Sequence, residues 1–437
     1  MIRNISVAGT VSLLLLLTIC IVAGGTPAFA GDRVFTLQQA VAFSLQHNGD
    51  LKALREEKGV REAGKIKAGL YPNPALGLEG TTGNLSGSPY ENRISVVISQ
   101  EFLTMGKRGK RLQVADKELE AFERQIENFG RLLAEDVKAA FYNLSLAKKR
   151  MELAERSIVL NKQLLTITKQ RFEADDIPEL DMNLAKVELA RSEGKKVEWE
   201  REVHLIKAKL LALMGFPQDE VAAFRPEPET NPLTKSLEEL RSMALSKRPD
   251  IKALEAEKEK EDFALDLAKA EAIPNITAGL GYQRETKSLE VAGNDVKGQD
   301  NLIALRFSVP IPLFDRNQAG VQEAQSKKRS IVNRLIYARQ VVERKVEAGY
   351  ARLTTADRAL AIYSRDIMPQ LEENLKLVQE AYRLGEVGIL SVIEEQKKFY
   401  EVNDAYLFTL YNRQSAMSEL EAAVGVEFKT ETNGGVR

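Results

Sequence analysis

The sequence has almost no cysteine or histidine. Cys20 is its only cysteine, and His47 and His204 are its only histidines. Cys20 lies in an apolar N-terminal segment, so the rest of the chain has no disulfide and no thiolate metal site. The two histidines have no partner at ligand spacing, so we expect no metal site. Phosphate-binding loops and Ser/His/Asp or Cys/His sets are also missing, so we expect neither an enzyme nor a bound cofactor.

The sequence also has little excess charge and few aromatic residues. It contains 62 Lys and Arg against 63 Asp and Glu, so nothing favours nucleic acid or an anionic membrane surface as a partner. Charged residues make up 29% and aromatic residues 6%. That composition is typical of long surface helices rather than of a compact enzyme core.

The longest apolar run lies at the N-terminus. Arg3 precedes an apolar stretch from Val11 to Val22, and Ala28-Phe29-Ala30 is a small-x-small cleavage pattern. We therefore expect residues 1–30 to be a signal peptide and the mature chain to begin near Gly31.

Two further expectations follow from this segment and from what comes after it. Ile19 stands before Cys20, where a lipoprotein signal has a small residue, so we expect no lipidation there. The rest of the sequence contains no run of 18 apolar residues, so we expect no membrane-spanning helix there. Insertion into a membrane would therefore require β-strands.

The rest of the sequence contains an internal repeat. The segment Asp50-Leu51-Lys52-Ala53-Leu54 returns as Asp250-Ile251-Lys252-Ala253-Leu254, and Pro72-Asn73 returns as Pro274-Asn275. Such self-similarity at a fixed spacing indicates two copies of one structural unit.

The clearest repeat is a hydrophobic seam. Between Leu112 and Ile158 apolar residues recur in steps of three and four, and the same steps recur 209 residues later, between Val321 and Ile367. Only Lys328 and Gly349 interrupt the second seam. Alternating steps of three and four are typical of a coiled coil. An ordinary helical bundle is the alternative, but the first long helix, extended to Phe172, would measure about 90 Å.

Each half predicts the same order: a helix of about thirty residues, two extended segments, a long helix, a tight turn and another thirty-residue helix. The shorter helices are expected at Thr36–Lys67, Met182–Met214, Ser236–Ala270 and Val392–Val424. We expect each pair to stack end to end along the long helix. The predicted organisation is a first repeat (31–214), an irregular linker (215–235), a second repeat (236–426) and a flexible tail (427–437).

The extended segments change to a period of two and predict two hairpins. The four expected strands include Ala75–Leu85, Ile94–Ile98, Ile276–Lys287 and Ile303–Ile311, and we expect each strand to be about ten residues long. Ten residues suit a tilted transmembrane strand. Four strands cannot close a barrel, and open edges do not survive in lipid, so membrane strands would require an oligomer. Arg306 would then face the lumen, because Leu305 and Phe307 would face lipid. A soluble sheet under a helical layer is the alternative.

Three motifs resemble the TolC-like outer-membrane factors, most closely their cobalt-zinc-cadmium resistance branch. They are Leu70-Tyr71-Pro72-Asn73-Pro74, the stretch from Ile98-Ser99-Gln100-Glu101-Phe102 to Gly106-Lys107-Arg108-Gly109, and Val309-Pro310-Ile311-Pro312-Leu313-Phe314-Asp315-Arg316-Asn317-Gln318. The order of elements is also similar over the whole expected mature chain.

The resemblance implies a mainly α protein with a membrane β-part. Three chains would form a homotrimer, with a trimeric α-barrel of coiled-coil helices crossing the periplasm and a 12-stranded β-barrel in outer-membrane lipid. The channel would dock on a periplasmic membrane-fusion adaptor and an inner-membrane RND pump, and would export heavy-metal cations without catalysis. Alternatives are the same fold serving drug efflux or protein secretion, and a soluble periplasmic coiled-coil adaptor.

The resemblance also implies roles for two helical turns, at residues 171–181 and 382–391. The residues expected to dock the adaptor are Asp175, Asp176, Pro178, Leu180, Gly385, Gly388 and Leu390. The residues expected to gate the pore are Asp181, Ser391, Glu394 and Glu395. Gly385 and Gly388 are expected to let the chain reverse, whereas Asp175 and Pro178 stand at those places in the first turn. An ordinary solvated helix surface is the alternative for the acidic residues.

Overall fold

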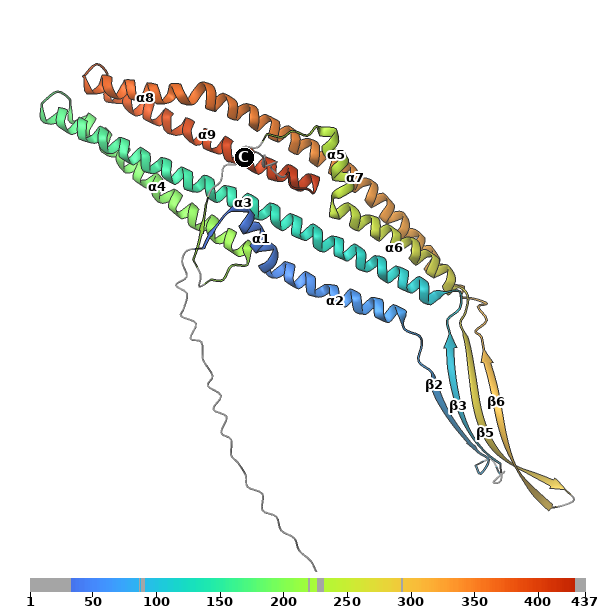
Figure 1. Cartoon of the computed structure of the whole chain (residues 1–437). Coiled ribbons are helices and arrows are strands. Elements are labelled where there is room, and N and C mark those ends of the chain that lie inside the picture. Colours follow the sequence, from blue (N-terminus) through green and yellow to red (C-terminus); the bar gives the residue numbers. More distant parts are fainter. Residues whose placement is uncertain are drawn as a thin grey trace, which may run out of the picture.

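The protein is a long rod of helices with strands projecting from one end (Figure 1). The computed structural model describes residues 33–85, 87, 91–218, 221–225, 232–291 and 294–428. The expected signal peptide and residues 429–437 of the expected tail lie outside this part of the chain. Within it, no helix combines the length and the apolar character needed to cross a membrane.

The two halves have the same order of elements. The first half contains β1 (Arg33–Phe35), α1 (Leu37–His47), α2 (Gly49–Gly69), β2 (Ala75–Thr82), β3 (Asn92–Phe102), α3 (Lys107–Glu173) and α4 (Glu179–Met214). After β4 (Ala222–Phe224), the second half contains α5 (Leu237–Lys247), α6 (Pro249–Glu271), β5 (Ile276–Val291), β6 (Asn294–Ser308), α7 (Gln318–Ile362), a π-helical turn (Tyr363–Ile367), α8 (Met368–Arg383) and α9 (Ile389–Val424).

The longest helix, α3, has 67 residues and is therefore about 100 Å long. Figure 1 shows α1 and α2 along one part of α3 and α4 along the other, as the stacking prediction requires. The seam positions are buried or half-buried in both halves, and Val137 in α3 and Val346 in α7 are fully buried. Gly349, which interrupts the seam in sequence, is buried against Leu420, and a Cβ there would lie 3.3 Å from that side chain.

The prediction of one thirty-residue helix at the start of each half is wrong. Each helix is broken, at Asn48 in the first half and at Arg248 in the second. The Asn48 side chain accepts from the amide of Leu51 at 3.0 Å and donates to the carbonyl of Leu213 at 3.0 Å. The break therefore caps α2 and also satisfies a carbonyl at the end of α4.

The prediction of one uninterrupted long helix in the second half is also wrong. It is divided by the π turn at Tyr363–Ile367 before α8 begins. A π turn accommodates one extra residue within a helix. This insertion explains why the repeat spacing is 209 residues along the seam and 210 at the helical turns, where Asp175 corresponds to Gly385.

The expected irregular linker contains a short strand. β4 pairs in parallel with β1, which places Phe35 opposite Phe224 in an aromatic cluster with Phe141 and Phe216. Residues 219–220 and 226–231 of the linker are outside the described residues. The start of the expected tail is anchored, because the amide of Phe428 donates to Glu421 at 2.8 Å.

The four long strands form one antiparallel sheet in the order β2-β3-β5-β6. The two predicted hairpins are therefore joined through β3 and β5, with Ser99 opposite Gly279. The strands have 8, 11, 16 and 15 residues, so the uniform length of ten was wrong for the second hairpin. Within the described residues, β2 and β6 are the edges of this sheet.

Gly215→Ala is expected to destabilise the fold. Gly215 ends α4 at a φ of +63°, and a Cβ there would lie 2.5 Å from the carbonyl oxygen of His47. We expect a loss of about 2–4 kcal/mol in the free energy of unfolding. Gly64→Ala is the matched control, because Gly64 lies inside α2 with open space around it. This control substitution should raise the free energy of unfolding by about 0.5–1 kcal/mol. Thermal unfolding in detergent measures both, and equal midpoints would contradict the predicted clash.

Candidate functional site

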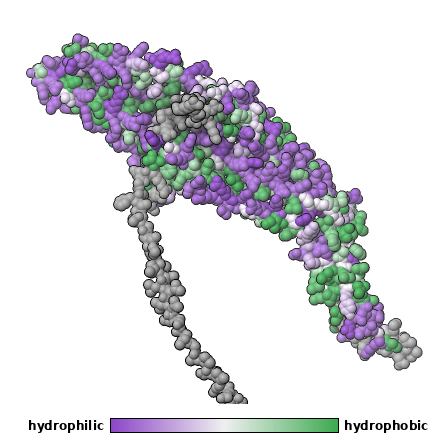
Figure 2. Space-filling model, in the orientation of Figure 1, coloured by the Kyte–Doolittle hydropathy of each residue, from purple (hydrophilic) through white to green (hydrophobic). Residues whose placement is uncertain are grey.

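One face of the four-stranded sheet is apolar and exposed. Two cross-strand rows define it, and their members are 40–80% exposed: Leu76, Ile98, Leu280 and Leu305 in one row, and Leu78, Val96, Tyr282 and Ile303 in the other. Figure 2 shows this apolar zone on the strands near the helices, with hydrophilic surface farther out. On β6 and its continuation the zone runs from Ile303 to Ile311, about 26 Å at 3.3 Å per residue.

The opposite face of the same sheet is polar or glycine-rich. Arg306 lies on this face opposite Gly279, between the apolar-face residues Leu305 and Phe307. Arg93 and Glu285 are paired across β3 and β5 on the polar face, with a 2.6 Å ion pair. The sheet therefore separates an apolar from a polar environment, and the alternation read from the sequence assigned Arg306 to the polar face.

A buried lysine fixes the sheet to the helices. Lys107, the first residue of α3, is 3% exposed. Its ammonium donates to the carbonyl of Ile273 at 2.5 Å and to the side chain of Asn275 at 2.6 Å. Asn275 in turn donates to Glu101 at 2.7 Å. Burial lowers the pKa of Lys107, and nearby Glu271 opposes this effect only in part. The motif that contains Glu101 and Lys107 thus meets the repeated Pro274-Asn275 segment at the junction, which sequence reasoning did not foresee.

The two helical turns at the far end of the rod have the same backbone conformation. Asp175 has a φ of +60° and Gly385 a φ of +81°. In each turn the next amide bonds five residues back, from Asp176 to the carbonyl of Arg171 and from Glu386 to that of Ala381, both at 2.9 Å. This is the Schellman end of a helix. The aspartate is therefore accommodated in the glycine's conformation, as short polar side chains can be.

Gly388 does not play the role expected for it. Its φ of −80° is close to the −73° of Pro178, its counterpart in the first turn, so neither position needs glycine. Of the two expected turn glycines, only Gly385 uses the left-handed region. The first turn thus reproduces the second in spite of its different sequence.

The tyrosine behind the second turn connects it to the first half. Tyr382 is 1% exposed, and its hydroxyl lies 3.0 Å from the hydroxyl of Thr168 on α3. Arg171 donates to the Tyr382 carbonyl at 3.0 Å and stacks over its ring. These residues were not identified from the sequence. The difference between Tyr382 and its counterpart Phe172 was the available signal.

The residues at the ends of the turns are exposed. Among the expected docking residues, Asp175, Asp176, Pro178 and Gly388 are exposed, and Leu180 and Leu390 are 65% and 60% exposed. Leu384 is a further leucine exposed here, at 63%, and was not predicted. The structure thus brings acidic and apolar side chains together at one end of the rod.

The expected gate residues have different surroundings. One face of α9 carries Ser391, Glu394 and Glu395, which are separated by three residues and by one. Ser391 and Glu394 are exposed. Glu395 is 14% exposed and accepts from Lys398 at 3.1 Å, while its other oxygen is buried without a hydrogen-bond partner among the described residues. Asp181 is half-buried at the start of α4. Glu394 is therefore the carboxylate most available to solvent.

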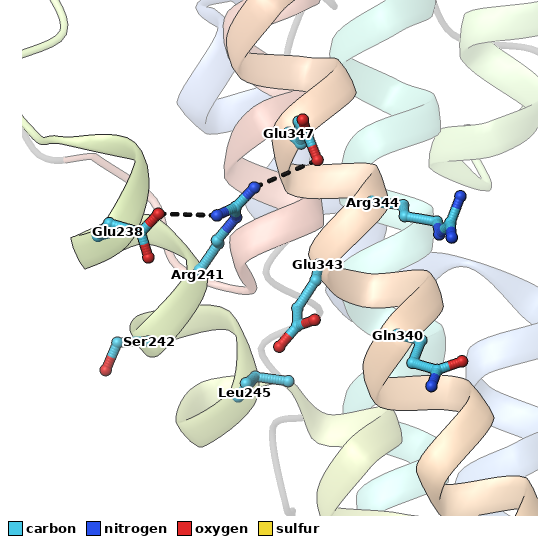
Figure 3. A pocket seen from close by; sticks show the side chains of 8 residues that line it. All are labelled: Glu238, Arg241, Ser242, Leu245, Gln340, Glu343, Arg344 and Glu347. Carbon is cyan, nitrogen blue, oxygen red and sulfur yellow. Dashed lines mark hydrogen bonds and ion pairs between the residues drawn. The ribbon is translucent and has the colours of Figure 1, made fainter.

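An open groove of about 880 Å³ lies between α5 and α7. Figure 3 shows Arg241 of α5 bonded to Glu238 on its own helix and to Glu347 on α7, at 2.7 and 3.2 Å. Gln340 lines the same groove on α7. Across the described chain, no group of three His, Cys, Asp or Glu side chains is arranged to hold a metal ion.

Two curated relatives of this chain are named for metal resistance and for cation efflux. It is 21% identical to the cobalt-zinc-cadmium resistance protein CzcC of Cupriavidus metallidurans, over 89% of this chain and 90% of the relative. It is 23% identical to the cation efflux system protein CusC of Escherichia coli O157:H7, over 92% and 88% of the two chains.

Solved structures with the same fold are outer-membrane channels. The crystal structure of CusC matches with a TM-score of 0.73 at 18% identity, covering 89% of this chain and 92% of that one. The CmeC outer-membrane channel of Campylobacter jejuni matches with a TM-score of 0.73 at 14% identity, covering 90% and 86%. The fold, with its helical rod and terminal sheet, is that of these channels.

The duplicated organisation also agrees with a family profile. The profile described as "Outer membrane efflux protein" matches residues 44–216 and again residues 240–426, once for each half. The resemblance to TolC-like factors is thereby confirmed, and with it the location in the outer membrane and the absence of an enzymatic role. The chain belongs to the outer membrane efflux protein family.

Proposed function

We propose that this protein is the channel subunit of a tripartite efflux system that exports heavy-metal cations across the periplasm and the outer membrane. The observation that carries the proposal is the sheet, which has an apolar face, a polar face and two open edges, at the end of a helical rod about 100 Å long. A two-sided sheet of this kind suits a wall between lipid and an aqueous pore.

Closure of that wall supports a homotrimer. The free edges of β2 and β6 would lose hydrogen bonds in lipid, and pairing β6 of one copy with β2 of the next removes both edges. Three copies give a 12-stranded β-barrel, and their helices give a trimeric α-barrel. At the usual strand tilt of about 35–45°, the apolar zone of about 26 Å along the strand covers a height of roughly 20 Å, close to the roughly 25 Å apolar band of a membrane barrel. Arg306 and the Arg93–Glu285 pair then line the lumen.

The opposite end of the rod suits a protein partner. The matching turns around Asp175 and Gly385 present exposed Leu180 and Leu390 beside acidic side chains. Six such turns in a trimer form a ring on which a periplasmic membrane-fusion adaptor would dock, linking the channel to an inner-membrane RND pump. Because the two turns share one backbone conformation, both can contribute to this ring.

The relatives favour metal cations as cargo. Besides CzcC, the nickel-cobalt-cadmium resistance protein NccC of Alcaligenes xylosoxydans is 23% identical to the chain over 355 residues. Export of organic compounds or of proteins by the same fold remains the second candidate, because the outer-membrane channel CmeC shares this fold and its name gives no metal cargo. Acidic rings that attract cations support the first candidate.

The pore gate is proposed at the first turns of α9 and α4. Threefold symmetry would bring three copies of Glu394 together, with Ser391, Glu395 and Asp181 nearby. Glu394 is the exposed carboxylate of this set and can face the axis, whereas the ion pair of Glu395 with Lys398 already compensates part of the charge of Glu395.

Deletion of the gene is expected to make cells more sensitive to zinc, cadmium, cobalt or copper, because export to the outside would stop. Growth on a series of metal concentrations measures the effect, and re-expression of the intact protein is the control. Sensitivity only to dyes and detergents would instead assign the channel to organic-compound efflux.

Leu305→Arg is expected to prevent assembly in the outer membrane, whereas Ala304→Arg should be tolerated. The two residues are neighbours on β6 but lie on the apolar and polar faces. An arginine in the lipid-facing position costs about 2–4 kcal/mol per copy near the membrane centre. The amount of heat-sensitive oligomer in outer-membrane extracts measures assembly. Equal loss in both variants would contradict the assigned faces.

Glu394→Ala is expected to raise the conductance of single channels in planar bilayers and to weaken block by divalent cations, because the acidic ring would lose its charge. Glu401→Ala is the matched control, since Glu401 is another exposed glutamate on α9, two turns farther on. Unchanged conductance and block in Glu394→Ala would refute the gate while leaving the channel assignment intact.

A further inference from the structure

The three motifs quoted from the sequence meet where the helices join the sheet. Lys107 donates to the carbonyl of Ile273, two residues after α6, at 2.5 Å. Arg108 donates to the carbonyl of the last residue of α2 at 2.6 Å. Asn317, just before α7, donates to a carbonyl in the last turn of α6 at 2.8 Å. The ends of α2, α3, α6 and α7 therefore lie at one level of the rod (Figure 1).

Large apolar side chains are exposed at this level. Tyr71 is 68% exposed and Phe314 is 92% exposed. Phe102, 55% exposed, lies opposite Ile276 at the pair of β3 and β5 nearest the helices, on the same face of β3 as Ile98. The apolar face of the sheet therefore continues to the ends of the helices. Aromatic side chains at such an edge are typical of the boundary between acyl chains and headgroups.

An arginine accompanies an exposed ring in each half. The guanidinium of Arg108 lies 4.6 Å from the centre of the Tyr71 ring. Arg316 is exposed two residues after Phe314. Stacking on an aromatic face restrains a guanidinium and leaves its N–H edge available. Each half thus places one ring and one arginine at the edge of the apolar face.

Most of the donor capacity of Arg108 is unused within the chain. Its Nε donates to the carbonyl of Gly69, and its Nη1 and Nη2 atoms have no hydrogen-bond or ion-pair partner among the described residues. The residue is half-buried. The donors of a guanidinium match the oxygens of a phosphate. Arg108 is therefore suited to an oxyanion from outside the chain.

The start of α3 has an excess of positive charge. Lys107, Arg108, Lys110 and Arg111 lie within five residues, and the first turn has no acidic residue. Only Arg111 among them has an ion pair in the described chain, with Glu271 at 3.5 Å. Cations at a helix N-terminus are opposed by the helix dipole, so an anion there would be stabilising. This charge alone suits any anion, whereas the adjacent exposed rings favour a lipid.

We infer that this level of the protein binds the headgroups of glycerophospholipids in the periplasmic leaflet, with Arg108 as the ligand of the lipid phosphate. The rings of Tyr71 and Phe314 lie at the boundary of the acyl chains, and Arg316 attracts a second headgroup. The inference rests on the proposed membrane barrel and names the lipid partner at its periplasmic rim. A free phosphate ion would satisfy Arg108 but leave the rings uncovered.

Lipid retention by the detergent-extracted oligomer tests the site. Native mass spectrometry counts the lipids retained after addition of dioleoyl phosphatidylglycerol. Dioleoylglycerol, which has the same acyl chains without the phosphate, is the comparison lipid, and inorganic phosphate is added as a competitor in a further sample. The variants are Arg108→Gln and Arg108→Lys. Arg124→Gln is the matched control, because Arg124 lies on the same helix about 24 Å farther from the sheet.

The intact oligomer is expected to retain phosphatidylglycerol and little dioleoylglycerol. Arg108→Gln should weaken retention about tenfold, because the charge-assisted hydrogen bonds to the phosphate are lost. Arg108→Lys should keep part of the retention, and Arg124→Gln should match the intact protein. Each variant is first required to form the heat-sensitive oligomer. If Arg108→Gln does not assemble, Tyr71→Leu takes its place, since this change removes the stacked ring and keeps the arginine.

Equal retention of the two lipids, or unchanged retention in the Arg108 or Tyr71 variant, would overturn the headgroup site and leave the channel standing. Loss of phosphatidylglycerol to an equal concentration of inorganic phosphate would replace the lipid by a free anion and overturn the lipid assignment. A chain that is soluble without detergent and retains neither lipid would overturn the membrane barrel and the headgroup site together.

Discussion

The hydrogen bonds of a strand edge are the constraint on which the rest of this architecture depends. Lipid has no hydrogen-bonding group for an unpaired backbone amide or carbonyl, so a sheet in the membrane must close on itself. The chain supplies four strands and leaves the edges of β2 and β6 open. In the proposed barrel, closure would come from other copies, and the helices attached to the strands would then form a ring as well. The junction at Lys107 and Asn275 makes this coupling rigid, because it bonds the start of α3 to the segment leading into β5.

Duplication gives two similar halves, and the chain joins them through chemically specific side-chain pairs. Within the chain, the halves are joined by charged and hydroxyl pairs such as Arg150–Asp404 and Thr168–Tyr382. A pair of this kind is specific, since removing one partner leaves a buried polar group unsatisfied.

The sequence was most informative where a single physical period dominates. Steps of three and four in the seam predicted the long helix α3, and alternation around Arg306 predicted the two faces of the sheet. It was least informative where side chains act on backbone groups elsewhere. The break at Asn48 depends on a carbonyl of Leu213, 165 residues away, and no local pattern contains that partner. The Tyr382–Thr168 contact was hidden for the same reason.

The helical turns show why a motif can be lost while its geometry is kept. A Schellman end requires one left-handed residue, and glycine is the least costly choice, as at Gly385. Aspartate tolerates the same φ better than a branched side chain, because its short polar side chain can bond locally. Three residues after Asp175 and Gly385, Pro178 and Gly388 both adopt an extended conformation, which suits proline at least as well as glycine. The first turn therefore has a different sequence and more charge on the same backbone, so the two turns can offer an adaptor the same shape with different chemistry.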